Sequence, residues 1–128
     1  MTINCILVVD DNEGDQFLAE HLIKKYLPDT QQLKAYDGEE ALRVIAESDV
    51  KPDIILLDIN MPGMDGFEFL EAYDQLPDRS AVVAMVSSSE DGRDRDRCEQ
   101  YEFVVDYFVK PLDGESVSKL ERLVSPAT

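Results

Sequence analysis

Residues 53–67, "DIILLDINMPGMDGF", indicate which class of fold the chain adopts. Four apolar residues, 54–57, are followed at once by Asp58, and then by a segment that contains one proline and two glycines. A short apolar run before such turn-forming residues is typical of a buried strand. A carboxylate at the end of a buried strand is costly unless something compensates it, so Asp58 is the first candidate functional residue.

Three further apolar runs predict strands of the same kind. They are "CILVV" (5–9), "AVVAMV" (81–86) and the pair "FVV" and "YFV" (103–109). Near-continuous apolar strands suit a parallel sheet that is covered by helices on both faces. A fifth segment, "QQLKAY" (31–36), alternates between polar and apolar residues, and this pattern favours an edge strand.

The segments between these runs have the apolar spacing of amphipathic helices. The predicted inward-facing sets are Leu18, Ala19, Leu22, Ile23 and Tyr26; Ala41, Leu42, Ile45 and Ala46; Phe67, Leu70 and Tyr73; and Val117, Leu120 and Val124. Three pairs have the spacing of a capping box, namely Asp37 with Glu40, Asp65 with Glu68, and Ser88 with Asp91. Five alternating strand and helix units predict an α/β domain with right-handed crossovers.

The length and composition of the chain limit its domain organisation and the kinds of partner that it can bind. With 128 residues the chain is expected to form one domain, with its core at about 3–124 and a short tail at 125–128. A net charge of −16 argues against binding to nucleic acid or an anionic membrane, and favours cationic ligands, although solubility or a salty habitat would also explain it. The sequence shows no membrane span, no signal peptide and no cysteine framework, since Cys5 and Cys98 are far apart, so we expect a cytoplasmic protein.

Polar residues end the predicted strands, where open α/β sheets bind their ligands. They are Asp10, Asp11, Asp58, Ser87 and Lys110. Carboxylates brought together repel one another unless a cation neutralises them, and Mg²⁺ suits a site with few protein oxygens and several waters. A carboxylate between Mg²⁺ and an ammonium group can accept a phosphoryl group, because both cations stabilise the charge on its oxygens.

Four motifs in this order and spacing resemble the receiver domains of two-component response regulators: "VVDDN", "LLDINMPGMDG", "MVSSS" and "YFVKP". The resemblance extends from about Ile3 to Val124. It implies a flavodoxin-like, doubly wound (βα)5 fold with a five-stranded parallel sheet of order 2-1-3-4-5. The alternating segment 31–36 would then lie at one edge of the sheet.

The same resemblance implies a role for each site residue. Asp58 corresponds to the phosphoacceptor and Lys110 to the phosphate-pairing lysine, whose bond to Pro111 is cis in the family. Mg²⁺, with Mn²⁺ as a substitute, would be held by Asp11, Asp58, the backbone carbonyl of Asn60 and, through water, Asp10. Ser87 and Tyr107 correspond to the switch hydroxyl and the switch aromatic residue.

The expected function is that of a phosphorylation-controlled switch. A histidine kinase or histidine phosphotransfer protein would donate the phosphoryl group, and an unknown downstream protein would read the altered surface. We expect no DNA-binding output domain after Val124, and the chain is expected to catalyse only its own phosphorylation and dephosphorylation. The face containing Tyr107 and Lys119 is a candidate for pairing of two copies.

Some of these residues also fit other classes of protein. A phosphatase or phosphotransferase of the haloacid-dehalogenase type also uses a strand-end Asp, but usually carries a second carboxylate where this chain has Asn60. A degenerate receiver that binds partners without phosphorylation, or a receiver from a hybrid kinase, would look much the same. An EF-hand loop is excluded by Pro62 and Phe69. The charged "RDRDR" (93–97) fits a solvated helix face or an output surface, and the lone His21 a surface residue.

Overall fold

The computed structural model describes residues 3–88 and 92–124, which form a single five-stranded sheet between two helical layers. The strands are β1 (Cys5–Val9), β2 (Gln31–Ala35), β3 (Ile54–Asp58), β4 (Val82–Ser87) and β5 (Val104–Val109). They pair in parallel in the order β2-β1-β3-β4-β5. The predicted fold, strand order and edge position of β2 are therefore confirmed.

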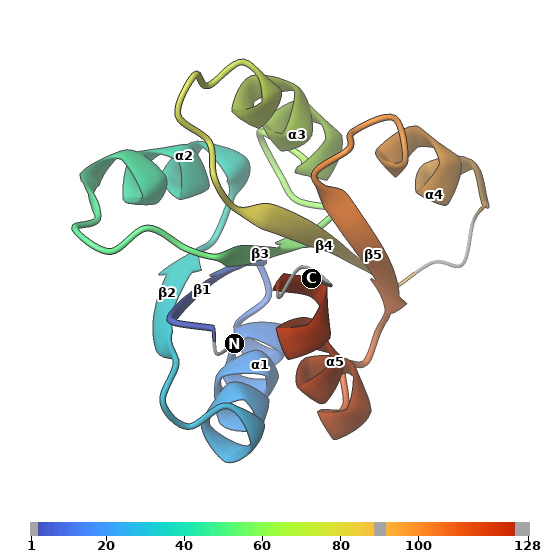
Figure 1. The fold of residues 1–128 in the computed structure, drawn as a ribbon. Coiled ribbons are helices and arrows are strands. Elements are labelled where there is room, and N and C mark those ends of the chain that lie inside the picture. The colour runs from blue at the N-terminus through green and yellow to red at the C-terminus, as the bar shows by residue number, and fades with distance from the viewer. Residues whose placement is uncertain (1–2, 89–91, 125–128) are drawn as a thin grey trace.

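The helices alternate with the strands along the chain. They are α1 (Glu13–Tyr26), α2 (Gly38–Glu47), α3 (Gly66–Asp74), α4 (Gly92–Cys98) and α5 (Gly114–Val124). Helices α1 and α5 cover one face of the sheet, and α2, α3 and α4 cover the other (Figure 1). Alternate residues of each central strand serve the two cores: in β3, Ile54 and Leu56 face α1 and α5, whereas Ile55 and Leu57 face α2 and α3.

Side-chain caps begin the helices at the carboxyl edge of the sheet. Asp37 accepts a hydrogen bond from Glu40 N (2.7 Å), and Asp65 forms a complete capping box with Glu68, as predicted. The Asn12 cap of α1, which accepts from Asp15 N (2.9 Å), was not predicted. The proposed partner of Ser88, Asp91, lies outside the described residues.

Replacing Asp65 with Ala is expected to lower the free energy of unfolding by about 1 kcal/mol, the usual cost of losing an N-cap. The hydrogen bond that Asp65 Oδ1 accepts from Glu68 N (2.9 Å) would disappear, leaving that donor at the start of α3 without its cap, whereas the backbone N–H of residue 65 can still donate to Glu68 Oε1. Urea denaturation measures the change. Glu71→Ala on an exposed part of the same helix is the control, because it removes a charge without touching the cap. Equal losses in the two variants would contradict this prediction.

Two aromatic residues differ from the predicted helix faces. Phe69 was not placed in the apolar set of α3, yet it is fully buried and its ring stacks on Tyr73, with 5.6 Å between the ring centroids. Tyr26 was placed on the buried face of α1 but is 41% exposed, so this prediction was wrong. It lies in the last turn, where its ring packs against Gly114 of α5 and leaves its other side open to solvent.

Candidate functional site

The carboxyl ends of the central strands bring the predicted acidic residues together. Asp10 directly follows β1 and Asp58 ends β3, and these two strands are neighbours in the sheet, with Val9 opposite Leu57. Carboxylate oxygens of Asp10, Asp11 and Asp58 all lie within 4.8 Å of one another. Asp10 and Asp58 are buried, with 6% and 5% of their surface exposed, whereas Asp11 is open to solvent.

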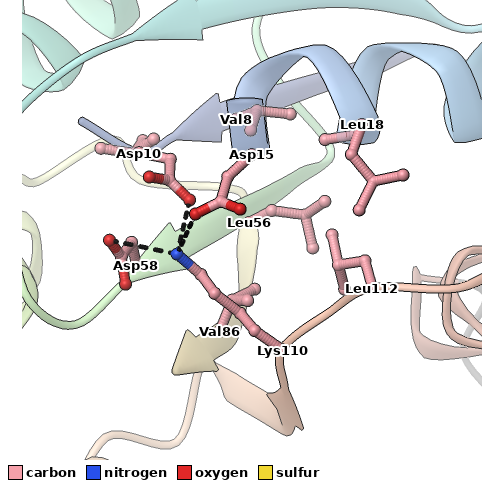
Figure 2. Close-up of a pocket in the computed structure, with 11 residues that line it drawn as sticks. Val8, Asp10, Asp15, Leu18, Leu56, Asp58, Val86, Lys110 and Leu112 are labelled. Carbon is pink, nitrogen blue, oxygen red and sulfur yellow. Dashed lines mark hydrogen bonds and ion pairs between the residues drawn. The ribbon is translucent and has the colours of Figure 1, made fainter. Parts of the chain in front are cut away.

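Lys110 reaches this cluster from the end of β5 (Figure 2). Its Nζ lies 2.6 Å from Asp15 Oδ2, 3.0 Å from Asp10 Oδ2 and 3.6 Å from Asp58 Oδ2. The bond between Lys110 and Pro111 is cis, as the family resemblance implied. Asp15 was missed by the sequence prediction. The signal that would have found it is the Asn12 cap, which places Asp15 in the first turn of α1 at the same edge of the sheet.

Burial and mutual repulsion raise the proton affinity of the buried carboxylates. Removal of Asp58 from water, together with the neighbouring charge of Asp10, raises the pKa of Asp58 to about 6, although Lys110 and a backbone hydrogen bond from Asn60 oppose the shift. Burial likewise raises the pKa of Asp10. Burial alone would lower the pKa of Lys110, but its hydrogen bonds to Asp15 and Asp10 outweigh that effect and raise it. Lys110 is therefore a permanent cation at neutral pH.

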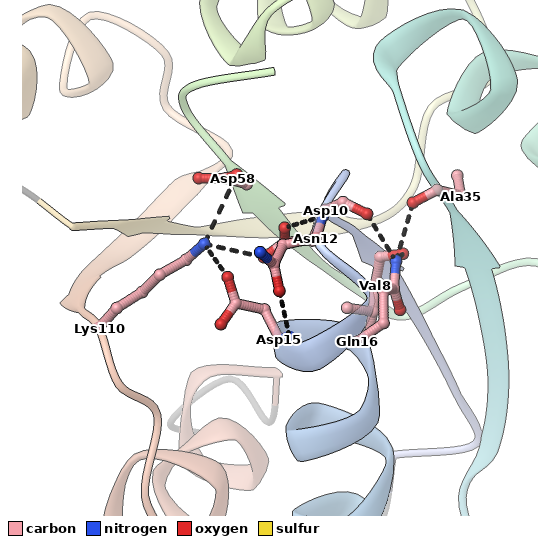
Figure 3. A network of polar contacts seen from close by, with 8 residues as sticks. All are labelled: Val8, Asp10, Asn12, Asp15, Gln16, Ala35, Asp58 and Lys110. Carbon is pink, nitrogen blue, oxygen red and sulfur yellow. Dashed lines mark hydrogen bonds and ion pairs between the residues drawn. The ribbon is translucent and has the colours of Figure 1, made fainter. Parts of the chain in front are cut away.

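Gln16 supports the turn that carries Asp10 (Figure 3). Its buried Nε2 donates to the carbonyl oxygens of Val8 (3.1 Å), Asp10 (3.1 Å) and Ala35 (2.9 Å), and so joins α1 to the ends of β1 and β2. The backbone N–H of Asn12 donates to Asp10 Oδ1 (2.9 Å). These contacts hold the Asp10 carboxylate in one orientation toward Asp58.

The loop after Asp58 is held against the strand by close backbone packing. Ile59 N donates to Val86 O (3.2 Å), and Gly66 N donates to Ile59 O (2.9 Å). A Cβ atom at Gly66 would lie 2.7 Å from Asp58 O and 2.8 Å from Ile59 Cα, so only glycine fits there. The predicted backbone ligand Asn60 is exposed and follows Asp58 by two residues, and its role as a metal ligand stays a prediction.

The two predicted switch residues lie on β4 and β5. Ser87 is fully buried at the end of β4, and its carbonyl accepts a hydrogen bond from Lys110 N (2.7 Å). Tyr107 is 8% exposed and lies within β5, outside the carboxylate cluster. The guanidinium of Arg95 in α4 stacks over its ring, 5.0 Å from the centroid. The switch roles of Ser87 and Tyr107 stay predictions.

The donor set fits a hard divalent cation. Among the described residues, Lys110 pairs with three carboxylates at this edge of the sheet, and Asp11 adds a fourth beside them, so that one ammonium faces an excess of negative charge. Carboxylate oxygens are the ligands that Mg²⁺ and Mn²⁺ prefer, whereas no His or Cys belongs to the described cluster. Asp10, Asp11 and Asp58 are thus the residues that would hold such an ion. The exposed His21 in α1 is not part of this group.

Comparisons with known proteins agree with this geometry. Residues 6–121 match the response regulator receiver domain family. Protein PilH of Pseudomonas aeruginosa is 28% identical over 114 residues, which cover 89% of this chain and 91% of PilH. A two-component response regulator from Cytophaga hutchinsonii, of known structure, superimposes with a TM-score of 0.86 at 28% identity and covers 97% of this chain and 98% of its own. The Mn²⁺-bound form of response regulator Rcp1, a Synechocystis protein, has a TM-score of 0.73 at 27% identity, over 93% of this chain and 89% of its own.

A parallel sheet of order 2-1-3-4-5 with acidic strand ends and a lysine beside them defines a CheY-like receiver. The chain belongs to the response regulator receiver domain family of two-component signalling. No helix in residues 3–88 and 92–124 is long and apolar enough to cross a membrane.

Proposed function

We propose that Asp58 accepts a phosphoryl group from a histidine kinase or a histidine phosphotransfer protein. The observation that supports this most strongly is the position of its carboxylate, which is buried between the acidic pair Asp10 and Asp11 and the ammonium of Lys110. A nucleophilic carboxylate in this setting is shielded from bulk water on the protein side and faces a cation on one flank.

In the proposed step, an oxygen of Asp58 attacks the phosphorus of the donor in line with the leaving group. A P–O bond to Asp58 forms while the P–N bond of phosphohistidine breaks, and the imidazole leaves with the electron pair of that bond. With acetyl phosphate as donor, a P–O bond breaks and acetate leaves. Lys110 pairs with the charge on the phosphoryl oxygens, and its raised pKa keeps it protonated throughout.

Bound Mg²⁺ or Mn²⁺ would act as a Lewis acid that neutralises the phosphoryl oxygens. Asp11, Asp58 and the Asn60 carbonyl are the proposed direct ligands, and Asp10 is the proposed ligand through water. Ser87 would donate a hydrogen bond to the phosphoryl group, and Tyr107 would respond on the surface formed by α4, β5 and α5. An unidentified protein would read that surface, and the chain would catalyse no reaction other than its own phosphorylation and dephosphorylation, in the cytoplasm.

Intact-mass spectrometry after incubation with acetyl phosphate tests this proposal. With Mg²⁺ the wild-type protein is expected to gain one phosphoryl group, and neither the chelator-treated protein nor Asp58→Asn is expected to gain it, because the nucleophile or its counter-charge is missing. Asp53→Asn is the matched control, since it makes the same change at the opposite end of the same strand, next to the first residue of β3.

A mass gain that persists in Asp58→Asn would assign the phosphoryl group to another residue. If the wild-type protein gains no mass and beryllofluoride also leaves its NMR spectrum unchanged, the chain is a degenerate receiver that binds partners without phosphorylation. The control variant Asp53→Asn should gain one phosphoryl group to the same extent as the wild-type protein.

A further inference from the structure

We propose that Asp15 is a positioning residue that holds Lys110 in the resting protein and opposes the phosphorylated form. This inference rests on the proposed phosphorylation of Asp58. It assigns a function to a carboxylate that the motif of strand-end residues does not include.

The ammonium of Lys110 lies at different distances from the three carboxylates around it. Lys110 Nζ is 2.6 Å from Asp15 and 3.0 Å from Asp10, which are both hydrogen-bonding distances, but 3.6 Å from Asp58. Figure 2 shows the side chain of Lys110 turned toward Asp15, with Asp58 on the other side of the ammonium. In this arrangement the lysine is bound most closely to a residue other than the proposed phosphoacceptor.

The position of Asp15 is well determined by the start of α1. Asn12 caps the helix and accepts a hydrogen bond from the backbone N–H of Asp15 (2.9 Å), and the negative side chain lies where the helix dipole favours it (Figure 3). The Asp15 side chain is 38% exposed and that of Lys110 is 18% exposed. The pair is therefore only partly shielded from water, and its strength is that of a partly exposed ion pair.

Phosphorylation would set up a competition for one ammonium group. A phosphoryl group on Asp58 needs Lys110 as its counter-charge, and each move of Nζ toward it lengthens the contact with Asp15. The carboxylate of Asp15 would also repel the phosphoryl oxygens, because both are negative. Removing the charge of Asp15 should therefore favour the phosphorylated form.

Beryllofluoride, a tetrahedral phosphoryl analogue, provides the first measurement. In the full chain with Mg²⁺, Asp15→Asn should bind beryllofluoride about five-fold more tightly than the wild-type protein, an effect the size of one partly exposed ion pair. NMR titration gives the affinities. The rate of phosphorylation by acetyl phosphate, followed by intact mass, should rise in parallel.

Two variants separate this role from general effects of charge. Glu13→Gln removes one negative charge from the same first turn of α1, and Glu13 makes no ion pair within the described residues, so its affinity should stay within about two-fold of wild type. Asp15→Glu restores the carboxylate and should return the affinity toward that of the wild-type protein. A purely structural role for Asp15 would not produce tighter binding in the Asn variant.

The outcomes distinguish the two proposals. If the wild-type protein is phosphorylated and Asp15→Asn binds beryllofluoride with equal or weaker affinity, the inference about Asp15 is wrong while the function of Asp58 stands. Weaker binding would mean that Asp15 holds Lys110 in its productive position. If the wild-type protein is not phosphorylated at all, both proposals fail.

Discussion

Replacing Asp58 with Asn should raise the free energy of unfolding of the metal-free protein by about 3 kcal/mol at about pH 7.5. The pKa of Asp58 rises from the usual 3.8 to about 6 in the folded protein, because the side chain is buried and lies beside Asp10. A carboxyl group that binds its proton more tightly in the folded state stabilises the fold below its unfolded pKa. That stabilisation is lost as the pH rises from 3.8 through about 6. Above that range the buried, charged Asp58 destabilises the folded protein, whereas the neutral Asn does not.

Urea denaturation in the presence of a chelator, at about pH 5 and about pH 7.5, measures this effect. The stability of the wild-type protein should fall between the two values by more than that of Asp58→Asn. Added Mg²⁺ should stabilise the wild-type protein and reduce the difference, because binding to the folded state alone shifts the unfolding equilibrium. Asp29→Asn is the control, since it removes one exposed acidic charge from the loop before β2, at the edge of the sheet opposite the site. Equal stability of the wild-type protein and Asp58→Asn at the higher pH would contradict the argument.

Gly66→Ala should lower the free energy of unfolding by roughly 2–3 kcal/mol, because the new methyl group collides with backbone atoms that have no other position available. The Cβ would lie 2.7 Å from Asp58 O and 2.8 Å from Ile59 Cα, and Gly66 N is itself hydrogen-bonded to Ile59 O. Relief of this contact must move α3 away from the end of β3. The same movement would displace the carboxylate of Asp58, so phosphorylation should also slow.

Gly92→Ala is the matched control for this change. Gly92 also begins a helix, but a Cβ there meets no atom within 4 Å, so the change in stability should stay within about 0.5 kcal/mol. Thermal unfolding of both variants, with phosphorylation rates from intact mass, makes the comparison. A Gly66→Ala protein as stable as Gly92→Ala would show that the loop after β3 adapts to the extra methyl group.

Much of the fold could be predicted because local patterns of apolar and polar residues indicate the strands and the layers around them. Near-continuous apolar runs such as 54–57 and 81–86 have no polar face, and this requires a sheet with helices on both sides. The alternation of 31–36 correctly placed β2 at an edge. Parallel strands end at the same edge, so the meeting of Asp10, Asp58 and Lys110 followed from their positions in the chain.

Other features depend on contacts between distant segments and leave little trace in local patterns. Phe69 falls outside the helical spacing that selected Phe67 and Leu70, but its ring is buried because it stacks on Tyr73. Tyr26 fits the buried spacing of α1, yet its ring is covered on one side only, by Gly114 at the start of α5. Whether a side chain at the end of a helix is covered depends on the neighbouring element, and periodicity carries no information about that neighbour.

By itself the sequence determined the order of the strands along the chain, the family and the residues at the carboxyl edge of the sheet. Only the tertiary structure decided which of these charges are buried and which of them pair. Asp10 and Asp58 are withdrawn from water, whereas Asp11, next to Asp10 in the chain, is not. Lys110 is bound most closely by Asp15, 95 residues away. Desolvation and ion pairing depend on distances of a few ångströms between packed elements, and those distances are set by packing and not by the local pattern of residues.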